Sequence, residues 1–275
     1  MPTKSILIAS DLSARSDRAL QRGFLLADQL DARVTVVSIV DDSLPESFAA
    51  EHVDKSRDHL EACVNSMAAG VACDIRVETG DPVARLVEIV NAAEFDLAVV
   101  GRHRPRGLFD GLRRTTVESV VAQSLTPVLM VCDPVHAGYE RILAPVSFSA
   151  SCRKAVTTAL ELAPEAAFRL VHLWVAPFQG LTGGQFSDFA RTVQRETAEQ
   201  AATWGKSLPA SLPAVDLVHG GIAAGCHTEI QGFTPDLVAV GANTRTLSFT
   251  GLGSFTAELV RDPPTDLLIA RGGEV

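Results

Sequence analysis

The chain has 275 residues, of which 47% are hydrophobic, and its formal net charge is −9. That length suits one large or two ordinary α/β domains, and the apolar content supplies a core that needs no disulfides or metals. The acidic balance excludes a general nucleic-acid binder and a protein that lies on anionic membranes, because both need a basic face.

Neither end of the sequence nor its interior shows a targeting or membrane segment. The first apolar stretch is too short for a signal peptide, and no apolar run approaches the roughly 20 residues of a membrane span. The five cysteines are odd in number and form no CxxC pair, which is typical of reduced thiols. We therefore expect a cytoplasmic protein with no disulfide framework and no bound metal.

Short runs rich in Val and Ile alternate with longer amphipathic stretches along the first part of the chain. We expect the short runs to be buried strands, at residues 6–9, 34–40, 75–77, 97–100 and 128–131. Residues 16–30 and 81–93 each place their apolar side chains on one helical face, which predicts helices between the strands. This alternation indicates a parallel sheet with helices on both faces.

The remainder of the chain repeats this pattern. Four segments recur in the same order: 5–20 as 141–156, 78–90 as 218–230, 94–103 as 234–243, and 126–133 as 265–272. A conserved order indicates tandem duplication, and Pro and Gly near residues 133–140 mark the boundary. We predict two open parallel-sheet, Rossmann-like domains, residues 1–136 and 137–275. An apolar stripe from Phe186 through Phe189 to Trp204 predicts a core helix in the second.

The expected ligand sites lie beyond the carboxyl ends of the strands, as in other open α/β sheets. The turn after the first strand reads Ser10-Asp11-Leu12-Ser13 and contains no GxGxxG. The chain also has no GxxxxGK[ST] and no GxSxG. These absences exclude a Rossmann dinucleotide site, a P-loop and a hydrolase nucleophile elbow.

The layout resembles the universal stress protein family, in its tandem two-domain form. The resemblance covers nearly all of both halves. It rests on an acid that closes the first strand, a G-x2-G-x9-G-[ST] stretch after the fourth, and a last strand like CPVLVV, here TPVLMV at 126–131. It implies two adenine nucleotide alpha hydrolase-like domains that pack as a pseudo-dimer through their last strands, 126–131 and 265–270.

The resemblance also implies a nucleotide site in each half, in which the acid and the end of the second strand hold adenosine and the glycine stretch wraps the phosphates. In the first half the corresponding residues are Asp11 for the acid, Ile39 against adenine, Gly101 for the first glycine, Arg104 and Arg114 at the second and third glycine positions, and Thr115 for the hydroxyl. A non-glycine residue in a left-handed conformation costs about 1–2 kcal/mol. Two interpretations stay open for the arginines: solvated loop residues, or side chains that grip an anion.

The second half departs from the family pattern at other positions. Its corresponding residues are Ser147 for the acid, Leu173 against adenine, Gly241 for the first glycine, Thr244 for the second, and Gly253 and Ser254 for the final pair. The spacing before that final pair is one residue shorter than in the family. This half therefore keeps a phosphate-like turn and lacks the acid.

These patterns predict a stress-response regulatory or protective protein with degenerate nucleotide sites, and not a turnover enzyme. Binding of ATP or AMP with Mg²⁺ would be weak, confined to one half, or absent. Two alternatives stay open: a small-anion or nucleotide-handling enzyme with Asp11 and Asp110 as candidate acids, and a ligand-free interaction scaffold. The expected partner of each half is the other half; a homodimer of whole chains and an unknown protein partner are open.

Overall fold

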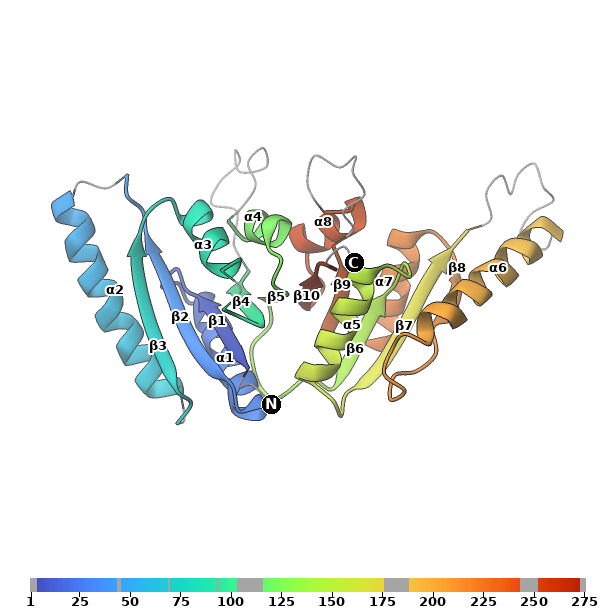
Figure 1. Ribbon diagram of the computed structural model, residues 1–275, viewed down its shortest axis with the longest axis horizontal. Coiled ribbons are helices and arrows are strands. Elements are labelled where there is room, and N and C mark those ends of the chain that lie inside the picture. Colours follow the sequence, from blue (N-terminus) through green and yellow to red (C-terminus); the bar gives the residue numbers. More distant parts are fainter. Residues whose placement is uncertain are drawn as a thin grey trace.

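The computed structural model describes residues 4–43, 46–68, 70–92, 94–102, 116–175, 188–242 and 252–272, with the backbone alone for residues 46–49 (Figure 1). We call residues 1–136 the first half and residues 137–275 the second half; the boundary itself stays a prediction. None of the described helices combines the length and the apolar content needed to cross a bilayer.

Strands and helices alternate along both halves, as the sequence predicted. The first half contains β1 (Ser5–Ala9), α1 (Ser16–Leu30), β2 (Arg33–Val40), α2 (Glu46–Met67), β3 (Cys73–Thr79), α3 (Pro82–Val90), β4 (Leu97–Gly101), α4 (Thr116–Gln123) and β5 (Val128–Val131). The second half contains β6 (Arg141–Pro145), α5 (Ala150–Leu162), β7 (Ala167–Trp174), α6 (Asp188–Gly205), β8 (Asp216–His219), α7 (Ile222–Phe233), β9 (Leu237–Gly241), α8 (Ser254–Arg261) and β10 (Asp266–Ala270).

The two halves share one ten-stranded sheet, in the order β3-β2-β1-β4-β5-β10-β9-β6-β7-β8. Neighbouring strands within each half are parallel. The halves meet at the antiparallel pair of β5 and β10, in which Leu129 lies opposite Leu268. Figure 1 shows this pair at the centre, between two halves of the same layout. The predicted pseudo-dimer through the last strands is therefore confirmed.

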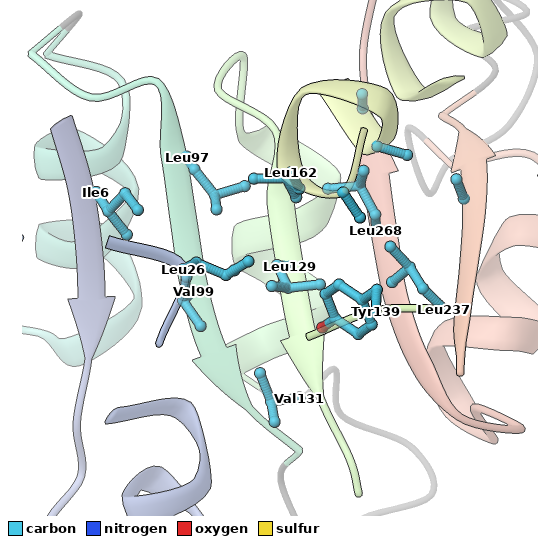
Figure 2. Packing of buried hydrophobic residues seen from close by; sticks show 14 of the residues in the cluster. Ile6, Leu26, Leu97, Val99, Leu129, Val131, Tyr139, Leu162, Leu237 and Leu268 are labelled. Carbon is cyan, nitrogen blue, oxygen red and sulfur yellow. The ribbon is translucent and has the colours of Figure 1, made fainter. Parts of the chain in front are cut away.

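Each strand of the sheet contributes side chains to both faces, because successive residues of a strand point to opposite sides. Ile6 and Ile8 belong to the apolar cluster under α1 and α5, while Leu7 belongs to the cluster under α3, α4 and α8. The first cluster also contains Leu129 and Leu268, and Figure 2 shows it running across the junction. The core is thus continuous between the halves.

Helix α6 follows the predicted stripe only in part. Ala190, Ala201 and Trp204 are buried, whereas Phe189 is 43% exposed. Residues 190, 201 and 204 fall on one helical face, and position 189 lies about 100° away from 190 around the axis. The prediction that Phe189 packs in the core is therefore wrong, and Phe186 lies outside the described residues.

Candidate functional site

The turn after the first strand of each half has the same backbone shape. Leu12 and Phe148 both adopt the left-handed conformation, with φ of 60° and 59°. Asp11 and Ser147 precede them directly, so a carboxylate in one half and a hydroxyl in the other occupy the same place in the fold. Each turn leads into the first helix of its half.

A cavity of about 300 Å³ lies beyond the carboxyl ends of β1, β2 and β4, with α4 on one side. Asp11, Ile39 and Gly101 line it, so the structure brings together three of the residues that the sequence singled out. The other first-half candidates, Arg104, Arg114 and Thr115, lie outside the described residues. We call this space the first-half cavity.

Asp11 stands at the rim of the first-half cavity with its carboxylate largely exposed. Its Oδ1 accepts the backbone N–H of Ser13 at 3.1 Å. Partial burial alone would raise the pKa of Asp11, but the hydrogen bonds from Ser13 and Ser16 outweigh it and lower this pKa below its ordinary value. The first-half cavity therefore carries a fixed negative charge at neutral pH.

Arg102 also lines the first-half cavity, and it connects the two halves. Its Nη2 lies 3.1 Å from Oδ1 of Asp262, which caps the C-terminal end of α8. On α4, the carboxylate of Glu118 lies 3.8 Å from Nε of Arg261. Both ion pairs join the first half to the second beside the contact of α4 with α8.

A second cavity, of about 490 Å³, occupies the equivalent place in the other half. Its lining includes Ser147, Leu173, Gly241, Gly253 and Ser254, so the second-half candidates converge there. Thr244 lies outside the described residues. No Asp, Glu, Lys or Arg is present among the described lining residues. We call this space the second-half cavity.

Two helices begin at the second-half cavity without a side-chain cap. Helix α8 starts after Gly253 and α7 starts after Gly221, and neither N-cap offers a side chain to the first-turn N–H groups. In the first half the helix equivalent to α7 is α3, in which Asp81 caps the N–H of Ala84 at 2.7 Å. Uncapped N–H groups and the helix dipole make the second-half cavity favourable for an anion.

Comparison with known proteins agrees with this architecture. The sequence model of the universal stress protein family matches the chain twice, at residues 2–131 and 138–271. The chain belongs to the universal stress protein family. No curated protein gives a significant match.

Solved structures match this universal stress protein over both halves. A universal stress protein from Archaeoglobus fulgidus is 16% identical over 98% of this chain and 97% of its own, with a TM-score of 0.72. A protein from Pseudomonas aeruginosa, described as a universal stress protein, is 17% identical over 98% and 94%, with a TM-score of 0.67. At such identities the matches show the tandem fold.

The first glycine of each motif has a packing role in this universal stress protein that sequence reasoning missed. A Cβ on Gly101 would lie 2.8 Å from the carbonyl oxygen of Arg15, and one on Gly241 would lie 2.6 Å from the backbone nitrogen of Cys152. These distances are too short for real contacts, because the start of α1 or α5 crosses the end of β4 or β9 closely. The only sequence signal for this was the recurrence of the glycine itself.

Two further residues line the second-half cavity. Cys152 Sγ accepts the N–H of Ser147 at 3.4 Å and lies 3.5 Å from its Oγ. Nδ1 of His172 lies 2.7 Å from the carbonyl oxygen of Val146, and its ring stacks on Phe148 with centroids 4.2 Å apart. These two contacts fix the position of the His172 ring at the wall of the cavity.

Proposed function

We propose that this protein is a cytoplasmic stress-response regulatory or protective protein that binds AMP or ATP in the second-half cavity and not in the first. Membership in the universal stress protein family supports the general role. The observation that carries the binding proposal is the uncapped N-terminus of α8 at a cavity whose described lining has no acidic side chain.

The phosphate would lie at the start of α8. Within the described residues, the N-cap Gly253 offers no side-chain acceptor to the N–H groups that follow it, and Ser254 also lines the cavity. Helix N-termini of this kind bind phosphate through N–H groups and the partial positive charge of the dipole. The absence of a carboxylate among the described lining residues removes one source of repulsion.

The base and sugar would occupy the rest of the second-half cavity. Leu173, Val240 and Ile222 supply apolar surface, and about 490 Å³ lies within the range of small-molecule sites. The hydroxyl of Ser147 is exposed at the position where the first half has its acid. It can hydrogen-bond a ribose, though less strongly than a carboxylate would.

The first-half cavity supports nucleotide binding less well. It is smaller, at about 300 Å³. Arginines also take the second and third glycine positions of its motif, at residues 104 and 114, where relatives of the family wrap the phosphates with glycine backbone. These features favour a single nucleotide site in the tandem chain.

We infer that the bound nucleotide is not turned over. A general base must reach the attacking water. No carboxylate lines the described part of the second-half cavity to act as that base. Any Mg²⁺ would be held through the phosphates, since this metal prefers oxygen ligands such as carboxylates and phosphates. Regulation by occupancy therefore fits the geometry better than catalysis.

The decisive experiment uses Gly253→Asp. Gly253 has φ of −60°, which any residue adopts, and Asp is a preferred N-cap, so α8 should gain about 0.5 kcal/mol. The new carboxylate would occupy the phosphate position. We expect the wild type to gain roughly 2.7 kcal/mol of stability at AMP or ATP concentrations about 100 times the Kd. The variant should gain no stability from nucleotide. Without nucleotide, its melting temperature should be no lower than that of the wild type.

The matched control is Gly232→Asp, the same change near the other end of α7, where a Cβ meets nothing within 4 Å. This variant should keep the full response to nucleotide. Heat release followed by mass spectrometry would identify any nucleotide that co-purifies. A wild type that neither carries nucleotide nor responds to it would contradict the binding proposal and favour a ligand-free scaffold.

A further inference from the structure

A buried carboxylate lies at the junction of the two halves. Asp266, the first residue of β10, is 0% exposed. It accepts the N–H of Cys132 at 2.7 Å, the N–H of Asp133 at 3.1 Å and the hydroxyl of Tyr139 at 2.7 Å. Nε of Arg22 lies 3.3 Å from its Oδ2. We call these five residues the junction cluster.

Most donors of the junction cluster come from the other half of the chain than its acceptor. Arg22 belongs to α1, and Cys132 and Asp133 follow β5 at the end of the first half, whereas Asp266 and Tyr139 belong to the second half. Arg22 also lies over the ring of Tyr139, 4.1 Å from its centroid, and donates to the carbonyl of Ala137 at 2.7 Å. Burial, together with the charge of Asp266, raises the pKa of Tyr139, so its hydroxyl stays protonated and donates.

The junction cluster has no counterpart on the other side of the pseudo-twofold axis. Asp266 is the first residue of β10 in its pairing with β9. The equivalent position in the first half is Pro127, directly before β5. Leu12 and Phe148 occupy equivalent turns, and Thr158 lies as many residues after Phe148 as Arg22 lies after Leu12. Thr158 therefore takes the place of Arg22 in the second half. The second half therefore has neither the arginine nor a tyrosine after its last strand.

Because the junction cluster is present on one side only, the edges of β5 and β10 favour pairing with each other over pairing with a second copy of themselves. If β5 paired with β5 of another copy, two Arg22 side chains would be buried without a carboxylate. If β10 paired with β10, two Asp266 carboxylates would face Thr158 in place of Arg22. A buried charge that has lost its partner is strongly unfavourable. The apolar residues of β5 and β10 alone would discriminate poorly, since both strands are short and fully buried.

We propose that the junction cluster is a specificity lock, in which Asp266, Arg22 and Tyr139 select the pairing of unlike halves within one chain and prevent like halves of two copies from joining edge to edge. A single buried polar pair that fixes register or partner choice is the best-attested role of such groups. The lock does not depend on nucleotide binding, so the two proposals stand or fall separately.

The test compares Asp266→Asn, Arg22→Met and the double variant in the full chain. Asp266→Asn leaves Arg22 buried without its partner. We expect the backbone amides of β5 and β10 to exchange with deuterium about a hundredfold faster than in the wild type. The double variant removes both charges, so it should regain most of the lost protection and yet show about tenfold more dimer than the wild type by native mass spectrometry, because the selection against like pairing is gone.

The control is Glu161→Gln, which breaks the exposed ion pair of Glu161 with Lys4, another contact between the halves. This variant should change neither the deuterium exchange of β5 and β10 nor the fraction of dimer. If Asp266→Asn does not fold, the double variant alone decides the question. A folded double variant with the dimer fraction of the wild type would overturn the lock.

Discussion

The two cavities occupy the same place in two copies of one fold, and they have diverged in opposite directions. The first half keeps the acid after its first strand and has arginines at two glycine positions of its motif. The second half has Ser147 instead of the acid, and keeps Gly253 and Ser254 at an uncapped helix start. The described lining of the first-half cavity carries one acid and two arginines, Asp11, Arg15 and Arg102, whereas the described lining of the second-half cavity carries none of these residue types. The comparison teaches that duplicated sites can lose complementary parts while the scaffold that positions them stays the same.

The largest expected effect tests what the two halves still share. Gly101→Ala and Gly241→Ala each place a Cβ within 2.8 Å of backbone atoms. Since the backbone of α1 or α5 must move to make room, each variant should lose about 2 kcal/mol or more of unfolding free energy. Urea denaturation measures this loss. Gly232→Ala, whose Cβ meets nothing within 4 Å, should instead raise stability by up to about 1 kcal/mol.

If only one of the two variants, Gly101→Ala or Gly241→Ala, loses unfolding free energy, the two halves do not share this contact. The close approach of the first helix would then be a requirement of one half alone, and the glycine of the other half would need a different explanation.

A smaller effect is expected when the acid is exchanged between the halves. Ser147→Asp places a carboxylate where the proposed site holds the ribose, and a carboxylate accepts hydrogen bonds from ribose hydroxyls more strongly than Ser147 does, so the affinity for AMP should rise about tenfold. Asp11→Ser removes the acid of the first half and should leave the affinity within about twofold of the wild type. Calorimetric titration of both variants measures these constants. A large effect of Asp11→Ser would move the nucleotide site to the first half.

The smallest effect concerns the pH dependence of Asp11. Its pKa is lowered in the folded protein, so its hydrogen bonds contribute stability above the ordinary value near 3.8, and this contribution is lost as the pH falls through the lower, folded value. Because the carboxylate is largely exposed, Asp11→Asn should cost at most about 0.5 kcal/mol at pH 7. The difference between the melting temperatures of variant and wild type should shrink as the pH falls below the ordinary pKa near 3.8. Ser147→Ala should show no such convergence, and a constant difference for Asp11→Asn would contradict the sign of the shift.

Much of the fold could be predicted because local patterns of apolar residues indicate its strands and helices. Buried parallel strands read as short Val- and Ile-rich runs, and the amphipathic stretches between them read as helices. The repeat then gave the order of both halves, and the resemblance to the universal stress protein family implied the pairing of their last strands. The errors arose where one residue departs from a pattern, as at Phe189, whose neighbour Ala190 takes the buried position on α6.

The candidate sites were predictable only in outline. The sequence located Asp11, Ile39, Gly101, Gly241, Gly253 and Ser254, and the structure brings each of them to one of the two cavities. It could not show that Gly101 and Gly241 accommodate a crossing helix, because that contact joins segments far apart in the chain. Asp266 escaped notice for the same reason: its partners are Arg22 and residues 132–139, and no local motif links them.

Among the strands that the structure describes, fusion into a single sheet leaves only β3 and β8 with an unpaired side. Along β3, Asp74, Arg76 and Glu78 alternate with apolar residues, and charged side chains on an outer strand discourage other chains from adding to it. Two separate domains of this kind would expose twice as many such borders. A tandem chain is therefore better protected against edge-to-edge aggregation than two separate domains would be.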